Sequence, residues 1–214
     1  MHSTVRRLWF GDQAQHVYYL GRYFSITIVD KLLIEPNTLQ MYNEPGKCVM
    51  LNAYKTKTDI ILIFASEQEI PYDYRDQAQQ RRIIEERFVG QGWRTSELLE
   101  EVRGSTSFYF DKLCQVRMPS WTKGRVALVG DAGYCVSPAA GRGGSLALDG
   151  AAALADAMRD RGGDFEQAFR DYDARFRPFI EEIQAEVVRT GLEMLVPTTA
   201  EAIRARNSQT GNLF

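Results

Sequence analysis

Cysteine and histidine, the residues that build disulfide frameworks and most metal centres, are scarce in this chain. Its 214 residues include 3 cysteines, at Cys48, Cys114 and Cys135, and 2 histidines. An odd number of scattered cysteines without a CxxC pair disfavours disulfides and a structural zinc site, so we expect a reducing compartment and no metal ligands. No stretch of about 18 apolar residues is present, which argues against a membrane-spanning helix.

Charge of one sign is not in excess either. The chain has 26 Lys+Arg against 28 Asp+Glu, a formal net charge of -2. This balance argues against a surface dedicated to nucleic acid or to an anionic membrane. The first seven residues are basic, but no apolar segment of signal-peptide type follows them. We therefore expect a cytoplasmic protein with no nucleic-acid or membrane partner.

Hydrophobic residues make up 44% of the chain, and their pattern in the first third is that of strands. Phe24, Ile26 and Ile28 alternate with polar residues, and two more apolar runs follow at 48–54 and 60–65. A polar segment between these runs has the character of a hairpin tip. The pattern predicts an antiparallel meander.

The middle of the chain mixes helix and strand signals. Helical spacing predicts helices over 77–89 and 96–102, with Thr95 or Ser96 as the cap of the second. Aromatic and aliphatic residues over 108–118 return to strand character.

The last third is helical. An alanine-rich helix is expected from Ser145 to about Arg161, and a second helix is expected to begin at Asp164 as N-cap. Pro178 lies inside the second pattern and is expected to kink that helix or divide it in two. The polar tail after Pro197 is expected to fray.

One segment carries functional information. A short buried strand over 126–129 is expected to end in Gly130 and Asp131, which places a carboxylate at the strand's C-terminal edge. Open α/β sheets bind ligands at that edge, and a carboxylate there can accept hydrogen bonds from a polyol.

A glycine-rich turn follows this strand at the start of the alanine-rich helix. Gly141, Gly143 and Gly144 flank Arg142 and precede Ser145. Glycines allow a ligand to approach the backbone, and a helix N-terminus offers unpaired N–H groups with a partial positive charge. The third glycine of a dinucleotide loop is absent and the strand ends about ten residues earlier, so this is not a pyrophosphate loop.

The order of these features resembles the second FAD motif of flavoprotein monooxygenases of the para-hydroxybenzoate hydroxylase-like group: an apolar strand, Gly-Asp-Ala, a proline seven residues after the aspartate, Gly-x-Gly and an alanine-rich helix. The resemblance implies that Asp131 hydrogen-bonds the ribityl chain and that Pro138 lies against the flavin ring. It also implies that the backbone from Gly143 to Ser145 faces the pyrimidine edge. Gly130, Gly141 and Arg142 complete the implied cofactor-binding set.

The same resemblance implies NAD(P)H- and O2-dependent hydroxylation of an aromatic or polycyclic small molecule, with FAD as cofactor and no catalytic side chain. The first seven residues resemble the tail of the family's middle motif, whose Asp-Gly pair is absent. The N-terminal Gly-x-Gly-x-x-Gly loop is also absent. Tyr134 stands where the family often has histidine. We therefore expect a partial flavoprotein monooxygenase in which FAD binding is weak or absent.

The expected fold class is α+β (α/β): an antiparallel substrate-binding sheet with two helices over 1–118, a remnant of an FAD-binding α/β domain with C-terminal helices over 119–195, and a tail over 196–214. Two alternatives remain open, a non-catalytic remnant and a small-molecule-binding module that a separate chain completes. A homodimer is a further possible state. Cys135 is interpreted as a small buried residue and Arg142 as an exposed loop arginine.

Overall fold

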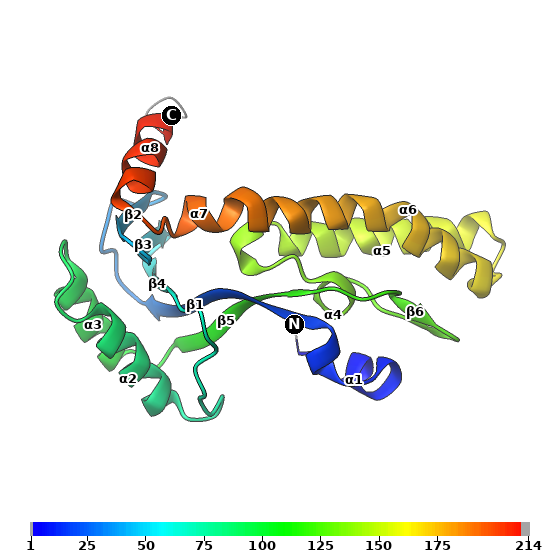
Figure 1. Cartoon of the computed structure of the whole chain (residues 1–214), viewed down its shortest axis with the longest axis horizontal. Helices are drawn as coiled ribbons and strands as arrows, with labels where there is room; N and C mark the ends of the chain where they lie inside the picture. The colour runs from blue at the N-terminus through cyan, green and yellow to red at the C-terminus, as the bar shows by residue number, and fades with distance from the viewer. Residues whose placement is uncertain (1, 211–214) are drawn as a thin grey trace. The chain divides into compact units, whose positions relative to one another are not determined.

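The computed structural model describes residues 2–210 and divides them into two compact units (Figure 1). Within the described part, unit 1 comprises residues 2–20 and 113–191, and unit 2 comprises residues 21–112 and 192–210. Each unit joins segments that are distant in the sequence. The boundaries thus differ from the three consecutive segments expected from the sequence, and the roles given to those segments stay predictions.

An antiparallel sheet dominates unit 2 and confirms the α+β class. Its strands within residues 2–210 are β1 (Val17–Val29), β2 (Leu39–Glu44), β3 (Lys47–Tyr54), β4 (Lys57–Ala65) and β5 (Phe108–Val116), in the order β2-β3-β4-β1-β5. The register pairs Met50 with Ile61 and Ser25 with Leu62. The meander expected from the alternating pattern is therefore present, with β2 as an additional strand.

Two helices of unit 2 follow the sheet in sequence. They are α2 (Gln77–Phe88) and α3 (Thr95–Gly104), close to the expected ranges. Phe88 of α2 meets Phe64 of β4 edge to face, with ring centroids 6.3 Å apart. The predicted cap of α3 is wrong, because Arg94 occupies the N-cap and its side chain makes no capping hydrogen bond. The Thr95 hydroxyl donates instead to the Gly92 carbonyl, which precedes the helix.

The expectation of a frayed tail is wrong for the described residues. A helix, α8 (Ala200–Thr210), follows the short α7 (Leu192–Leu195). The hydroxyl of Thr199 accepts from the backbone N–H of Ala202 at 3.1 Å, and Arg206 donates to Asn43 Oδ1 of β2 at 2.8 Å. A capped start and this long-range anchor hold a segment that its polar composition alone would leave loose. Residues 211–214 lie outside the described part.

Unit 1 is built mainly from helices and turns. Its elements are α1 (Thr4–Phe10), η1 (Gln13–Gln15), β6 (Thr122–Lys123), β7 (Val126–Ala127), α4 (Asp131–Tyr134), η2 (Pro138–Ala140), α5 (Gly143–Asp160), α6 (Phe165–Glu186) and the π-helical turn η3 (Val187–Gly191). Helices α5 and α6 lie side by side (Figure 1). Asp164 caps α6 as expected, because its side chain accepts from the N–H of Gln167.

Pro178 does not divide α6, which is one helix of 22 residues. Tyr172 before the proline and Ile180 and Ile183 after it belong to the same buried cluster. Because both halves pack into one core, the lost backbone hydrogen bond at Pro178 is tolerated without a break. Of the two expected outcomes, the division is therefore wrong, and the kink stays a prediction.

The expected strand over 126–129 is shorter than predicted. The strand comprises Val126 and Ala127, which pair antiparallel with Lys123 and Thr122 in a two-stranded hairpin. A longer strand needs a partner for each of its backbone groups. The residues after the hairpin instead lead into α4, so Asp131 stands at a helix start rather than at the edge of a parallel sheet.

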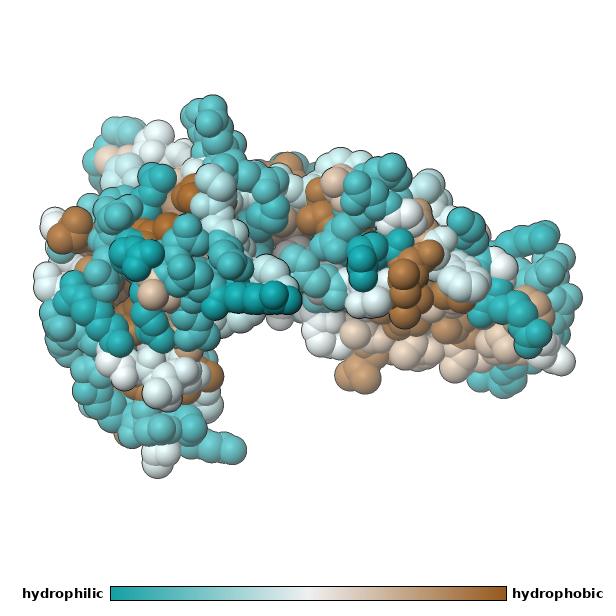
Figure 2. Space-filling model, turned by 90° about the horizontal axis from the view of Figure 1, so that it is seen from below, coloured by the Kyte–Doolittle hydropathy of each residue, from teal (hydrophilic) through white to brown (hydrophobic). Residues whose placement is uncertain are grey.

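Several large apolar side chains of unit 1 are exposed to solvent, among them Leu8, Trp9 and Leu148. The space-filling view shows apolar residues gathered on one side of this part of the molecule (Figure 2). Within the described residues, none of the helices is both long enough and apolar enough to cross a bilayer.

Candidate functional site

A pocket of about 540 Å³ opens in unit 1 between the residues that follow β7, the helix α4, the start of η2 and the first turns of α5. It is lined by Val129, Gly130, Asp131, Ala132, Cys135, Val136, Ser137, Pro138, Gly143, Gly144 and Ala147. Five of these are residues that the sequence predicts for a cofactor. The loop from Gly130 to Gly144 therefore folds around one cavity.

The carboxylate of Asp131 and the first turn of α5 face this same pocket. A Cβ placed on Gly143 would lie 3.9 Å from Asp131 Oδ1, and a Cβ on Gly144 would meet nothing within 4 Å. Asp131 and both glycines are exposed. A carboxylate acceptor and bare backbone amides thus stand next to each other in the wall of one cavity.

The N-terminus of α5 is open toward the pocket. Arg142 is its N-cap and supplies no side-chain hydrogen bond to the first turn, while the Ser145 hydroxyl donates to the Arg142 carbonyl at 3.0 Å. The helix runs for 18 residues, so its N-terminal amides carry the positive end of a macrodipole. The arrangement suits an anionic or electron-rich ligand edge.

Gly130 sets the distance between α4 and α5. Its φ is +64°, and a Cβ there would lie 3.1 Å from the Cβ of Ala147. Both the positive φ and the close approach require glycine. A side chain at this position would push α5 away from Asp131.

Ser137, which the sequence analysis did not single out, has a φ of +89°. Positive φ is rare for a residue with a side chain and costs on the order of 1–3 kcal/mol. The Ser137 side chain is buried and accepts from the N–H of Ala139 at 3.3 Å. This strained residue turns the chain so that Pro138 is exposed at the pocket.

Arg6 is a second residue next to the pocket that the sequence did not identify. Its side chain is fully buried, and Nη1 donates to the carbonyl of Ala132 at 2.7 Å. Burial lowers the pKa of Arg6, partly offset by Cys135. The bond fastens α1 to the loop that lines the pocket. Arg6 belongs to the first seven residues, which resemble the tail of the family's middle motif, and this resemblance could have pointed to it.

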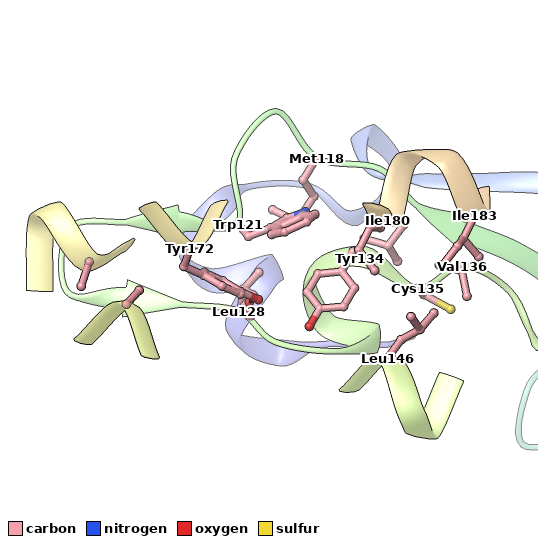
Figure 3. Close-up of a cluster of buried hydrophobic side chains, with 13 residues drawn as sticks. Met118, Trp121, Leu128, Tyr134, Cys135, Val136, Leu146, Tyr172, Ile180 and Ile183 are labelled. Carbon is pink, nitrogen blue, oxygen red and sulfur yellow. Dashed lines mark hydrogen bonds between the residues drawn. The ribbon is translucent and has the colours of Figure 1, made fainter. Parts of the chain in front are cut away.

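Tyr134 packs behind the pocket in an aromatic cluster (Figure 3). Its ring centroid lies 4.5 Å from that of Trp121 and 5.6 Å from that of Phe176. The Tyr134 hydroxyl occupies the space that a side chain would take at Gly150 of α5. The tyrosine at this position is thus matched by a glycine on the facing helix.

Cys135 is 4% exposed, and its sulfur lies within the buried cluster of Figure 3. Burial first, and then the charge of Asp131, raises the pKa of the Cys135 thiol to about 11. A protonated, buried thiol is a poor nucleophile. These properties agree with a packing role.

Three predicted residues do not line the pocket. Gly141 adopts the left-handed conformation at the end of η2, with a φ of +64°, and links the two lining segments. Ser145 uses its hydroxyl within the helix start. Arg142 lines a different cavity, together with residues of α6 and η3.

Comparison with known proteins places the chain in a family. The FAD binding domain family matches residues 27–186. A flavin-dependent monooxygenase of Legionella longbeachae is 37% identical over 188 residues, covering 86% of this chain and 48% of that protein. The crystal structure of the tetracycline destructase Tet(51) is 36% identical with a TM-score of 0.82, covering 97% of this chain and 56% of that one.

A more distant structure shares the fold alone. Klebsiella pneumoniae HpxO, solved in complex with FAD and uric acid, is 18% identical with a TM-score of 0.76, covering 97% of this chain and 53% of that one. The chain spans about half the length of the curated relatives it matches. It belongs to the FAD binding domain family of flavin-dependent monooxygenases, which confirms the resemblance inferred from the motif.

Proposed function

We propose that unit 1 holds the flavin end of FAD in the 540 Å³ pocket, as part of an NAD(P)H- and O2-dependent hydroxylation of an aromatic or polycyclic small molecule. The observation that carries this proposal is the placement of the Asp131 carboxylate 3.9 Å from a Cβ built on Gly143. A carboxylate that can accept from ribityl hydroxyls and a helix start that suits an electron-rich ring edge line the same pocket, so one flavin can contact both.

Each contact has a distinct physical task. Asp131 accepts hydrogen bonds from the ribityl hydroxyls, which is favourable because charge-assisted bonds are stronger than neutral ones. Pro138 offers an exposed apolar surface without an N–H group to a flat ring. The amides of Gly143 and Gly144 stabilise negative charge on the pyrimidine edge.

The fit of the cofactor is supported by the pocket itself. Apolar residues such as Val129, Val136 and Ala147 make up much of its wall, and the glycines leave the backbone accessible. Bound FAD supplies the redox chemistry, and the residues of this chain bind it, orient it and limit water around it. The likeness to a tetracycline destructase supports a polycyclic substrate.

A titration of the purified chain with FAD, followed by quenching of flavin fluorescence, tests the proposal. Asp131→Asn removes the charged acceptor and is expected to weaken FAD binding about tenfold, the cost of one charge-assisted hydrogen bond. Asp149→Asn is the matched control, because Asp149 is an exposed carboxylate of α5 that does not line the pocket. It should leave the affinity unchanged.

Two results would count against the proposal. Equal FAD affinity of the Asp131→Asn and wild-type chains would remove the assigned contact. Failure of the wild-type chain to bind FAD at any accessible concentration would favour the non-catalytic alternative, unless binding returns when a separate dinucleotide-binding polypeptide is added.

A further inference from the structure

A second cavity, of about 180 Å³, is lined in part by the same loop of unit 1, from Gly130 to Gly144, that lines the first pocket. Ala139, Ala140 and Arg142 come from the loop, and Ile183, Glu186, Val187, Thr190 and Gly191 come from the end of α6 and from η3. Pro138, Gly143 and Gly144 of the same loop face the first pocket instead. One loop therefore forms a wall of both cavities.

The helical side of this cavity has an unusual backbone. Residues 187–191 form a π-helical turn directly after α6. Such turns are rare and occur frequently at functional sites, because they redirect side chains that a regular helix would place elsewhere. Here the turn brings Val187 and Thr190 into the cavity wall.

Two opposite charges line the cavity. The guanidinium of Arg142 and the carboxylate of Glu186 form no ion pair or side-chain hydrogen bond with any residue in the described range 2–210. The backbone carbonyl of Arg142 is fixed by Leu146 N–H and the Ser145 hydroxyl, both at 3.0 Å. The backbone of Arg142 is thus held in place, while the N–H donors of its side chain stay available.

Apart from Thr190, the remaining side chains of the wall are apolar. Ile183 and Val187 are 5% and 4% exposed, and the two alanines face them from the loop. The hydroxyl of Thr190 donates to the Glu186 carbonyl at 3.1 Å and keeps its acceptor lone pairs. The cavity combines an apolar floor with one cationic donor and one anionic acceptor.

We infer that this cavity binds a small planar group that carries a hydrogen-bond acceptor and a donor side by side, of which an aromatic primary carboxamide is the simplest case. The amide oxygen accepts from Arg142, the amide N–H donates to Glu186, and the ring lies on Ile183 and Val187. A neutral ligand satisfies both charges, whereas a charged one meets repulsion from one of them. The site needs no flavin.

The test uses three probes of the same size on the full chain without flavin: benzamide with both functions, benzoate with acceptors only, and benzamidine with donors only. Binding is followed by the backbone amide signals of Ala139, Ala140 and Thr190 in two-dimensional NMR spectra. Benzamide is expected to shift these signals with a dissociation constant on the order of 1 mM, typical of so few atoms.

Two variants test the contribution of each charged side chain separately. Arg142→Gln should weaken benzoate about threefold, and Glu186→Gln should strengthen it about threefold, with the opposite signs for benzamidine. The controls are Arg189→Gln and Glu182→Gln, exposed residues of the same segment that do not line the cavity. They should change neither probe.

The source of the carboxamide is distinguished by competition. Displacement of benzamide by NADH would support a nicotinamide ring as the natural occupant, and failure of NADH to compete would exclude that ring and favour a substrate that carries a carboxamide. The inference is overturned if benzamide leaves the three amide signals unmoved, or if benzoate and benzamidine respond to each variant with the same sign. Flavin binding to the first pocket can succeed or fail independently of either result.

Discussion

Substitution of Gly150 by alanine sets helix propensity against packing, and the structure predicts that packing wins. Gly150 lies inside α5, where alanine is intrinsically favoured by about 1 kcal/mol. The added Cβ would overlap the Tyr134 hydroxyl, lie 2.9 Å from its Cζ and 3.2 Å from Cε1 of Phe176. Tyr134 is 1% exposed and has Trp121 on its other side, so its ring has no space to move into.

Overpacking of a closed core costs about 3 kcal/mol at its upper end, so the net loss for Gly150→Ala is about 2 kcal/mol. For a chain of this size that lowers Tm by roughly 4–8 °C, measured by circular dichroism during heating. Gly144→Ala is the control, because the same exchange in the same helix meets nothing within 4 Å and should not destabilise. A Gly150→Ala protein as stable as the wild type would refute the reasoning.

Three further predictions concern unit 1 and the buried thiols. Arg6→Met removes the donor to the Ala132 carbonyl and should lower the free energy of unfolding by about 1–3 kcal/mol in a urea titration, with no change expected if Arg6 is not structural. Pro178→Ala restores a helical N–H in α6 and should raise that free energy by about 1–3 kcal/mol; a lower value would contradict the packing account. The pKa values of Cys135 and Cys48 are raised by burial to about 11 and about 12 from 9.0, so the folded state binds more protons than the unfolded one above pH 9. Stability should therefore fall as pH rises from about 9 to about 11, and constant stability over that range would show that burial does not hold these thiols protonated.

Local patterns predicted most elements of this fold. Alternation in β1 and the polar tip between β3 and β4 were sufficient for the meander, and Asp164 was recognised as a cap from its residue type and position. These features depend on interactions within a few residues, which a single sequence displays directly.

The sequence predictions are wrong where contacts between residues distant in the sequence determine the structure. The composition of the tail does not reveal that Arg206 of α8 bonds to Asn43, and the proline in α6 does not reveal that both flanks share a core. The strand before Asp131 was predicted too long because its apolar residues also suit a hairpin followed by a packed turn. Tertiary contacts overrode local preference in each case.

The sequence predicted several residues that line the site, but it did not predict the backbone conformation and the packing that hold them in place. The motif identified Asp131 and the glycines that line one pocket with it, although their roles toward FAD stay predictions. No pattern in the sequence predicts the positive φ of Ser137 or the fit of Tyr134 against Gly150, because backbone strain and matched packing appear only when the chain is folded.

The position of bound flavin is the most direct test of the proposed FAD site. With the chain labelled by nitrogen-15 and titrated with FAD, we expect the largest amide shifts on Gly143, Gly144 and Ser145, and we expect Asp131→Asn to reduce them while Asp149→Asn does not. Flavin shifts centred on residues away from the first turn of α5, with those three amides unmoved, would contradict this site.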